Sequence, residues 1–374
     1  MRIVIVRREP KVAFSMDVYT NNLVEQLKKI HSEWEIIQIA PQPWSNDLDN
    51  LWHSGNPLRK YYERFYNHPR AVSQLQADLF HIIDHTNGHV AYWLKKLGKP
   101  VVITCHDLVQ YVYPEILKNQ SRFPAFSMAA WEYSVKGITV ADHTITVSTN
   151  TAQDITNYLN INPKKITVVP NGVESEFRQL SPAIVKKWRQ QYVNSSEEIC
   201  ILNVGSTHQR KNIITVLKVV KAIADRGLPV RLWKIGDDFT IKQKQFIRDR
   251  AIDKHITFLG KPEREALIYF YNAAHVLLSP SLYEGFGLTI LEAMACGTPV
   301  ITSNVSSLPE VAGDGAILVN PTDIEAITQA VFRLQKDSVY RQNLINQGLT
   351  KAKTFTWQKN AEDMERLYAQ IMFK

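Results

Sequence analysis

The chain has 374 residues, a formal net charge of +8 and a mean hydropathy of −0.21. This length suits a soluble protein with two α/β domains, and no apolar run reaches the roughly 18 residues of a membrane span. The cations are spread along the sequence, which favours an anionic small ligand over a nucleic acid, whose binding needs a dense basic stripe.

The cysteines and the amino terminus exclude further classes. Cys105, Cys200 and Cys296 are far apart and no Cys-x-x-Cys motif occurs, so neither a disulfide scaffold nor a zinc knuckle is expected. The apolar run 3–6 is too short for a signal peptide and is followed by Arg7 and Arg8. It therefore predicts a first buried strand and, by default, a cytoplasmic protein.

A helix is predicted over residues 19–30, because Leu23, Leu27 and Ile30 follow helical spacing. The loop between this helix and the first strand, residues 7–16, contains no glycine. A second strand is predicted over residues 35–40.

Residues 42–70 combine aromatic and basic side chains: Trp44, Trp52, Tyr61, Tyr62, Phe65 and Tyr66 with Arg59, Lys60, Arg64 and Arg70. Such a mixture suits a sugar stack or an anionic membrane surface. It equally suits a surface helix that packs its rings on its own domain. Asp47 and Asp49 are spaced like a metal-binding pair, but they lie in a Ser/Asn-rich turn, where acids usually cap helices or stay solvated. No metal site is predicted there.

His106 follows a predicted strand. Residues 101–104 form an apolar run typical of a buried parallel strand, and Cys105, His106 and Asp107 come directly after it. Open α/β sheets bind ligands at the carboxyl ends of their strands. His106 is therefore a candidate ligand-binding residue, and the alternative is a hydrogen bond within its own loop.

The second half begins its own sheet with a strand over residues 199–204. Gly205 then forms a turn, Arg210 and Lys211 follow, and a helix is predicted up to residue 224. Arginine can hold phosphate through two parallel hydrogen bonds, and lysine acts as a mobile charge. The pair is a candidate phosphate site, although two cations at a helix start are more often simply solvated.

A strand–loop–helix–strand unit spans residues 275–303. Gly285 and Gly287 allow the backbone to approach a ligand closely. A helix then runs from Leu288 to Cys296 and ends at Gly297. The free backbone N–H groups at the start of such a helix form a ready site for phosphate.

Two carboxylates flank this helix start, Glu284 before it and Glu292 on it. Because carboxylates repel phosphate, we expect these to accept hydrogen bonds from hydroxyl groups such as a vicinal diol. Phosphate and diols together indicate a sugar nucleotide. For an isolated pair of acids, two solvated side chains would be the simpler interpretation. The string also lacks the third glycine of a dinucleotide fingerprint, so hydride transfer is not predicted.

Residues 281–300 resemble the Glu-x7-Glu signature of glycosyltransferase family 4, which comprises retaining glycosyltransferases of GT-B fold. The resemblance rests on Ser281, on Glu-Gly-Phe-Gly-Leu from Glu284, on Leu-Glu-Ala-Met-Ala from Leu291 and on Gly-Thr-Pro-Val from Gly297. His106-Asp-Leu with Pro114-Glu115, the Arg210-Lys211 pair, and Pro170-Asn-Gly-Val are similar to further positions of the family. One departure is Phe14-Ser15-Met16, where members usually have a Gly-rich turn.

The resemblance implies an α/β protein of GT-B fold, with two Rossmann-like domains that face a cleft. Residues 1–173 would form the acceptor-side domain and residues 180–355 the nucleotide-sugar-binding domain. Residues 356–374 would form a helix that crosses back to the first domain through Ala361, Met364, Leu367 and Ile371.

The implied reaction is retaining transfer of a hexosyl group from a nucleotide-diphosphate sugar to a hydroxyl of a glycan or lipid-linked glycan, as in polysaccharide or glycolipid biosynthesis. No metal and no other cofactor is expected. Glu292 would hold the ribose diol. Glu284 would bind hydroxyls of the transferred sugar, helped by the amides of Phe286, Gly287 and Leu288.

The resemblance also implies that Arg210 and Lys211, beside the Gly205 turn, would stabilise the leaving diphosphate. His106 would contact the sugar near its reacting carbon. Peripheral contact with the inner face of a membrane through residues 42–70 is a further expectation, and no nucleic-acid partner is expected.

Two alternatives stay open. One is a phosphorylase or epimerase of the same fold, although no local motif nominates the lysine that a pyridoxal cofactor requires. The other is a catalytically silent sugar-nucleotide-binding or scaffold protein, which only the missing amino-terminal glycines favour.

Overall fold

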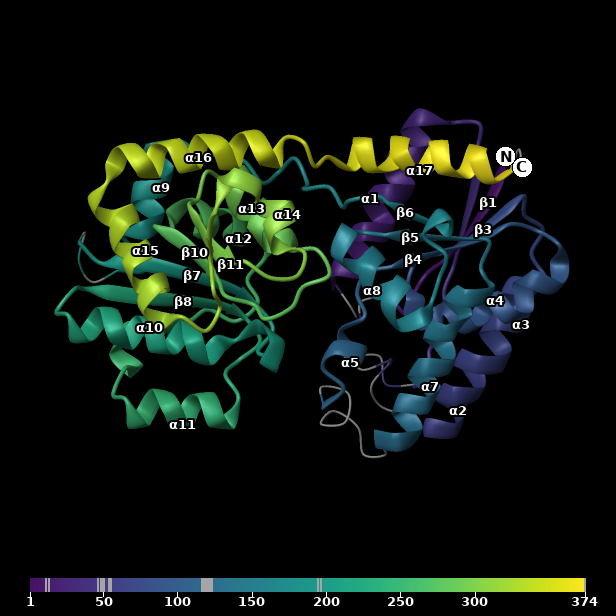
Figure 1. Cartoon of the computed structure of the whole chain (residues 1–374), viewed down its shortest axis with the longest axis horizontal. Helices are drawn as coiled ribbons and strands as arrows, with labels where there is room; N and C mark the ends of the chain where they lie inside the picture. Colours follow the sequence, from purple (N-terminus) through teal and green to yellow (C-terminus); the bar gives the residue numbers. More distant parts are fainter. Residues whose placement is uncertain are drawn as a thin grey trace. The chain divides into compact units, whose positions relative to one another are not determined.

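The computed structural model describes residues 1–372 except 11, 13, 46, 48–50, 53–55, 116–123, 194 and 196. The chain divides into two compact units, Met1–Gly172 with Trp357–Lys374, and Val173–Thr356. Over the described residues, each unit contains one six-stranded sheet whose neighbouring strands are all parallel (Figure 1). Both units are therefore α/β layers of the Rossmann type.

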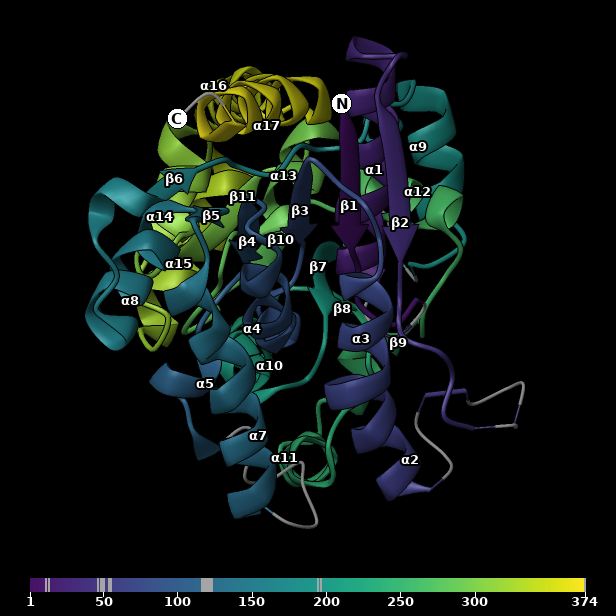
Figure 2. The same ribbon diagram turned by 90° about the vertical axis from the view of Figure 1, so that its right-hand side faces the viewer.

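The first sheet has the strand order β2-β1-β3-β4-β5-β6, and Figure 2 shows β2, β1, β3 and β4 side by side. Its strands are β1 (Arg2–Val6), β2 (Glu35–Ile39), β3 (Leu79–Ile82), β4 (Val101–Cys105), β5 (His143–Thr146) and β6 (Ile166–Val168). β1, β3, β4 and β5 lie inside the sheet, and nearly every residue in them is buried. This burial explains why they consist of apolar runs rather than alternating patterns.

The helices of the first unit cover both faces of this sheet. They are α1 (Phe14–Ile30), α2 (Pro57–Tyr62), α3 (His68–Ser73), α4 (Ala91–Leu94), α5 (Val109–Val112), α7 (Pro124–Lys136), α8 (Thr149–Leu159) and α17 (Trp357–Met372). A π-helical turn, Glu63–Asn67, joins α2 to α3.

The terminal helix α17 packs into the core of the first unit. Trp357, Ala361, Met364, Leu367 and Tyr368 share an apolar cluster with α1 and β1, and Figure 1 shows α17 in yellow beside α1. Its predicted apolar face is confirmed. A buried hydrogen-bond chain also holds it, because the Tyr368 hydroxyl lies 2.6 Å from His81 Nδ1 and His81 Nε2 lies 2.7 Å from Thr104 Oγ1.

The second sheet has the order β12-β11-β10-β7-β8-β9. Its strands are β7 (Ile199–Gly205), β8 (Val230–Gly236), β9 (Ile256–Phe258), β10 (Val276–Ser279), β11 (Val300–Ser303) and β12 (Ile317–Val319). Its helices are α9 (Pro182–Arg189), α10 (Ile213–Asp225), α11 (Ile241–Asp249), α12 (Arg264–Ala273), α13 (Leu288–Ala295), α14 (Leu308–Ala312), α15 (Ile324–Lys336) and α16 (Ser338–Ala352). Residues of β7, β8, β10, α10 and α15 form one apolar core.

One detail differs from the sequence prediction. α1 begins at Phe14 rather than at residue 19. Its first turn lies before the apolar residues Leu23, Leu27 and Ile30 that predicted the helix, and it contains no glycine or proline. All three cysteines are free and buried, as expected. No helix within the described ranges is long and apolar enough to cross a membrane.

Replacing Tyr368 by phenylalanine should destabilise the first unit by about 1–3 kcal/mol, because one ring nitrogen of buried His81 loses its partner. Burial lowers the pKa of His81 to about 3, so the neutral ring cannot relieve this loss by taking up a proton near pH 7. Chemical denaturation of Tyr368→Phe checks the effect, with Tyr158→Phe, a half-exposed tyrosine of α8, as control. Equal stability of both variants would contradict it.

Candidate functional site

The loop between β10 and α13 has the conformation that its glycines predict. Gly287 has φ +113° and directly precedes α13. A Cβ atom there would lie 3.1 Å from side-chain atoms of both Ile290 and Leu308, so glycine suits the position on both grounds. Gly297, with φ +73°, follows the helix. The predicted helix and its stop are confirmed.

Glu284 is buried between two cations. Its Oε2 lies 2.5 Å from Arg210 Nη1 and its Oε1 lies 2.5 Å from Lys211 Nζ, while the Ser281 hydroxyl donates to Oε1 at 2.7 Å. Burial alone would raise the pKa of Glu284, but the charges of Arg210 and Lys211 outweigh it and lower the pKa to about 2. The interpretation of these three groups as separate solvated side chains is therefore wrong.

The loop after β11 holds the backbone of Glu284. The Ser306 hydroxyl accepts from the Glu284 amide at 3.0 Å and donates to the Glu284 carbonyl oxygen at 2.6 Å. The Ser307 hydroxyl lies 2.8 Å and 2.9 Å from the carbonyl oxygens of Glu284 and Phe286. Neither serine is predicted from the sequence, in which a Ser/Asn-rich run directly after a strand is the only signal for them.

The Gly205–Asn212 loop is joined to the Glu284 loop. Leu282 donates its amide to the Arg210 carbonyl oxygen at 2.7 Å. Asn212, with φ +55°, donates its side-chain amide to the carbonyl oxygens of Pro280 and Pro321. Arg210 and Lys211 lie in a short 3-10 turn, and α10 begins only at Ile213. The predicted phosphate-binding pair thus reaches Glu284 from a neighbouring strand end.

Glu292 lies in a different environment from Glu284. The Tyr271 hydroxyl donates to Glu292 Oε2 at 2.6 Å, and Tyr271 is fully buried. Burial raises the pKa of Glu292 to about 7, because the single phenol bond offsets only part of the cost of removing the charge from water. Tyr271 was not predicted as a partner, because it precedes Glu292 by 21 residues on another helix.

His106 directly follows β4 in the first unit and is 7% exposed. Its Nε2 lies 2.8 Å from the Ile83 carbonyl oxygen, which can only accept, so Nε2 carries the proton. Burial lowers the pKa of His106, which keeps the ring neutral and leaves a lone pair on Nδ1. The partner of Nε2 directly follows β3 and lies outside the loop of His106, so this bond is structural, and contact with a ligand stays a prediction.

The predicted residues of the second unit lie together. Lys211 Nζ is 3.7 Å from the position that a Cβ on Gly205 would take, Phe286 is buried against Phe355 with ring centroids 5.7 Å apart, and Leu288 is the first residue of α13. Since His106 belongs to the first unit, its contact with a sugar held by the second unit stays a prediction. Of the pair Asp47 and Asp49, Asp49 lies outside the described residues.

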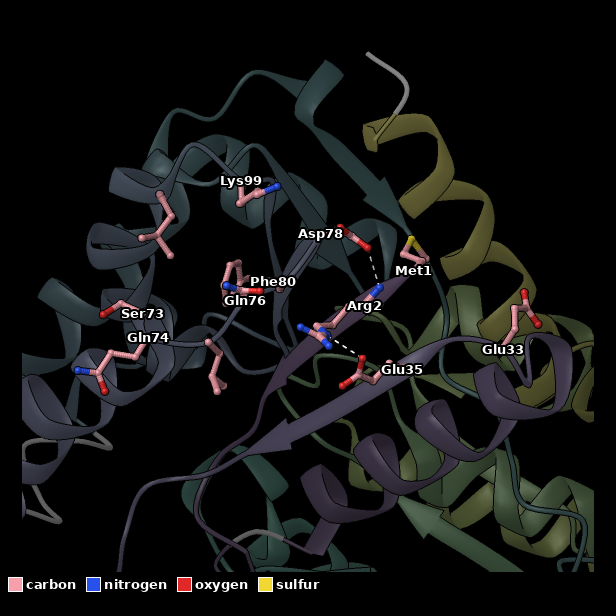
Figure 3. Close-up of a pocket in the computed structure, with 13 residues that line it drawn as sticks. Met1, Arg2, Glu33, Glu35, Ser73, Gln74, Gln76, Asp78, Phe80 and Lys99 are labelled. Carbon is pink, nitrogen blue, oxygen red and sulfur yellow. Dashed lines mark hydrogen bonds and ion pairs between the residues drawn. The ribbon is translucent and has the colours of Figure 1, made fainter.

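A depression of about 740 Å³ lies at the other end of the first sheet (Figure 3). It is lined at the amino-terminal ends of the strands, where Arg2 bonds to Glu35 through its side chain and to Asp78 through its amide. Because open α/β sheets bind ligands at the carboxyl ends, where His106 lies, this depression is not the candidate site.

Comparison with known proteins covers both units. Residues 16–177 match the family model Glycosyltransferase Family 4, and residues 185–351 match Glycosyl transferases group 1. The O-antigen chain mannosyltransferase B of Escherichia coli is 30% identical over 350 residues, which cover 90% of this chain and 88% of that protein.

Solved structures are similar over nearly the whole chain. Sucrose-phosphate synthase from Thermosynechococcus elongatus has a TM-score of 0.79 at 22% identity and covers 99% of both chains. Anabaena HepE in complex with UDP has a TM-score of 0.75 at 15% identity and covers 99% of this chain and 100% of its own. With the two parallel sheets, these likenesses confirm the predicted GT-B fold with two Rossmann-like domains.

Glu292→Gln should gain thermal stability relative to the native protein as the pH rises from 5 to 8. The folded pKa of about 7 exceeds the ordinary value of 4.5, so the native state keeps a proton that the unfolded chain releases between these values. The stability that Glu292 contributes is therefore full below about pH 4.5 and is lost as the pH rises through 7. Glutamine does not titrate and avoids this loss.

Melting temperatures at pH 5 and pH 8 measure the effect. Glu325→Gln, an exposed acid of α15 whose pKa is lowered, is the control and should show a constant difference from the native protein over this range. A constant difference for Glu292→Gln as well would refute the raised pKa.

Proposed function

Because the chain belongs to the group 1 glycosyltransferases of glycosyltransferase family 4, we propose that it transfers a hexosyl group from a nucleotide-diphosphate sugar to an acceptor hydroxyl, with retention of the anomeric configuration. One observation carries the proposal. The Arg210–Glu284–Lys211 cluster joins two cations to a carboxylate directly before the start of α13. Groups suited to phosphate and groups suited to hydroxyls thus meet in one place.

Donor binding exchanges partners within this cluster. The diphosphate takes up Arg210 and Lys211, and Glu284 turns its released oxygens to hydroxyls of the sugar. The two cations and the backbone N–H groups at the start of α13 then stabilise the charge that grows on the leaving diphosphate. Side chains and backbone N–H groups supply the compensating positive charge, so the proposed reaction needs no metal.

The remaining roles follow from the environments of two residues. Glu292 accepts hydrogen bonds from the ribose diol, with Tyr271 fixing the position of Oε2. His106 offers the lone pair of Nδ1 to a sugar hydroxyl, because its Nε2 proton is held by Ile83. Residues 1–173 would hold the acceptor, and residues 356–374 complete that domain.

Likeness to O-antigen chain mannosyltransferase B supports mannose as the transferred sugar and a glycan or lipid-linked glycan as the acceptor. We also propose that the reaction takes place at the cytoplasmic face of a membrane, where a lipid-linked acceptor would be anchored. GDP-mannose, UDP-glucose and ADP-glucose, tested by thermal shift and by turnover, separate the choices of base and sugar. A ligand present at 100 times its dissociation constant stabilises the protein by about 2.7 kcal/mol, which is easily measured.

Glu284→Gln should lower turnover of the preferred donor about 100-fold. Its affinity for the free nucleoside diphosphate should equal or exceed that of the native protein, because no acid competes for Arg210 and Lys211. Turnover and calorimetry with UDP or GDP measure the two effects, with Glu325→Gln as the surface control. A native protein that binds nucleotide sugars without turnover would instead be a silent binder. Release of sugar 1-phosphate from glycan and phosphate would indicate a phosphorylase.

Only some of the aromatic side chains in residues 42–70 are exposed to solvent, and these support the proposed membrane contact. Trp44 is buried and donates to the Trp52 carbonyl oxygen, while Tyr61 and Phe65 pack on Phe126 and Tyr133 of α7. These rings fit the alternative of packing within the domain. Others face solvent: Tyr62 is 58% exposed and Tyr66 is 44% exposed, with ring centroids 5.3 Å apart.

The charge beside Tyr62 and Tyr66 favours an anionic surface. Arg59 and Arg70 are exposed on α2 and α3. Glu63, the single acid in the sequence 56–73, is buried and accepts from the Gln42 amide and from Asn67. Exposed tyrosines flanked by arginines are typical of side chains that lie at a lipid headgroup layer. We therefore place the contact on α2 and the π-helical turn after it.

Replacing Tyr62 and Tyr66 together by serine should weaken binding to vesicles that contain anionic lipid by about tenfold, because two apolar rings no longer enter the interface. Vesicle co-sedimentation measures this binding, and Tyr158→Ser, which removes a 46% exposed ring from α8, is the control. Unchanged binding of the double variant would rule out this surface.

A further inference from the structure

Lys234 of β8 is a lysine in the interior of the second unit. It is 0% exposed, and it follows Val230 and Leu232 on the face of the sheet that packs into the apolar core. Because every second residue of a strand faces the same side of the sheet, a third apolar residue is expected at position 234. The break occurs at the carboxyl end of the strand, where the Gly205 turn begins on the neighbouring strand.

The ammonium group of Lys234 is bonded to backbone oxygens. Nζ donates to the carbonyl oxygen of Gly205 at 2.6 Å and to that of Ile235 at 2.8 Å. The nearby acids pair with other lysines, because Asp237 lies 2.9 Å from Lys261 and Asp238 lies 2.5 Å from Lys244. Carbonyl dipoles orient a cation but do not neutralise it, so the site keeps an excess of positive charge.

Gly205 is fixed from two sides. Gly236 packs so closely that a Cβ on it would lie 2.2 Å from the Gly205 carbonyl oxygen, which leaves this oxygen directed at Lys234. In a trans peptide the following N–H points the opposite way, so the bond to Lys234 turns the Ser206 N–H away from the buried lysine. On the other side of Gly205, Lys211 Nζ is 3.7 Å from the position of a Cβ.

We propose that Lys234 is a positioning residue for the donor diphosphate, which it serves by fixing the Gly205 turn and by adding a third, buried positive charge beneath it. The inference rests on the proposed function of this site. Burial lowers the pKa of Lys234 to about 8, against the opposing effect of Asp237, so the amine is mostly charged at pH 7. Lys234 Nζ bonds directly to carbonyl oxygens rather than to a carboxylate, and a buried cation held in this way generally costs stability compared with an apolar side chain of the same volume. A diphosphate at the turn supplies the missing negative charge.

Lys234→Met keeps the length of the side chain and removes its charge. For whichever of UDP, GDP and ADP the native protein binds most tightly, the dissociation constant should rise about tenfold, and the donor KM should rise with it while the acceptor KM stays unchanged. The melting temperature without nucleotide checks the fold of this variant, because removing the buried ammonium relieves one cost while the Gly205 and Ile235 carbonyl oxygens lose their donor. Lys244→Met, on a half-exposed lysine of the same unit, should bind nucleotide like the native protein.

The outcomes separate the two proposals. A Lys234→Met protein that binds the nucleotide within twofold of the native protein overturns the role of Lys234. A native protein that binds none of the three nucleotides overturns the proposed function instead. If Lys234→Met does not fold, Lys234→Gln decides, because its amide can still donate to Gly205 but carries no charge. Weakened binding in that variant supports the role of the charge, and unchanged binding overturns it.

Discussion

The ion pairs that Glu284 makes with Arg210 and Lys211 are the interaction on which the site of the second unit depends. A carboxylate removed from water is stable only when partners satisfy both of its oxygens, and here two cations and the Ser281 hydroxyl do so. The partners Arg210 and Glu284 are 74 residues apart. Their pairing therefore also fixes the distance between the Gly205 turn and the start of α13, which are the two backbone segments that a diphosphate would have to span.

The sheet makes this pairing possible because β7, β10 and β11 are neighbours whose carboxyl ends meet at one edge. The three loops that leave this edge each contain a residue with positive φ, and these residues are Asn212, Gly287 and Ser306. Asn212 and Ser306 have positive φ without being glycine, a conformation that costs about 1 kcal/mol or more for an ordinary side chain. Both use their side chains to bond the neighbouring loop. The strain is thus held at the point where three segments must keep a common geometry, as expected for a preorganised site.

The sequence predicts the features that depend on neighbouring residues, and it does not predict contacts between residues that are far apart in the chain. The stop of α13 at Gly297, the turn at Gly205 and the apolar strands are local, and each was predicted from neighbouring residues. The start of α1 was missed because its first turn precedes Leu23, Leu27 and Ile30, whose apolar spacing predicted the helix. Tyr271 with Glu292, and Tyr368 with His81, are 21 and 287 residues apart, so their contacts exist only once strand order and helix packing are known. Lys234 was missed because a lysine in a strand is normally a solvated edge residue, and only the burial of β8 between β7 and β9 excludes that interpretation.

The two acids of one signature show why residue type alone does not fix chemistry. Glu284 and Glu292 are both removed from water, yet the pKa of the first falls to about 2 and that of the second rises to about 7. The difference lies in their partners, since two cations compensate the charge of Glu284 whereas a neutral phenol compensates only part of that of Glu292. Glu284 is therefore an anion in the structure without a ligand, and it holds Arg210 and Lys211 in place. Further hydrogen-bond donors would lower the pKa of Glu292 and favour its charged form, and the two hydroxyls of a diol are donors of this kind. In the proposed function, binding of a ribose and ionisation of Glu292 would be one coupled event, and the acid would favour a ligand that brings its own hydrogen-bond donors.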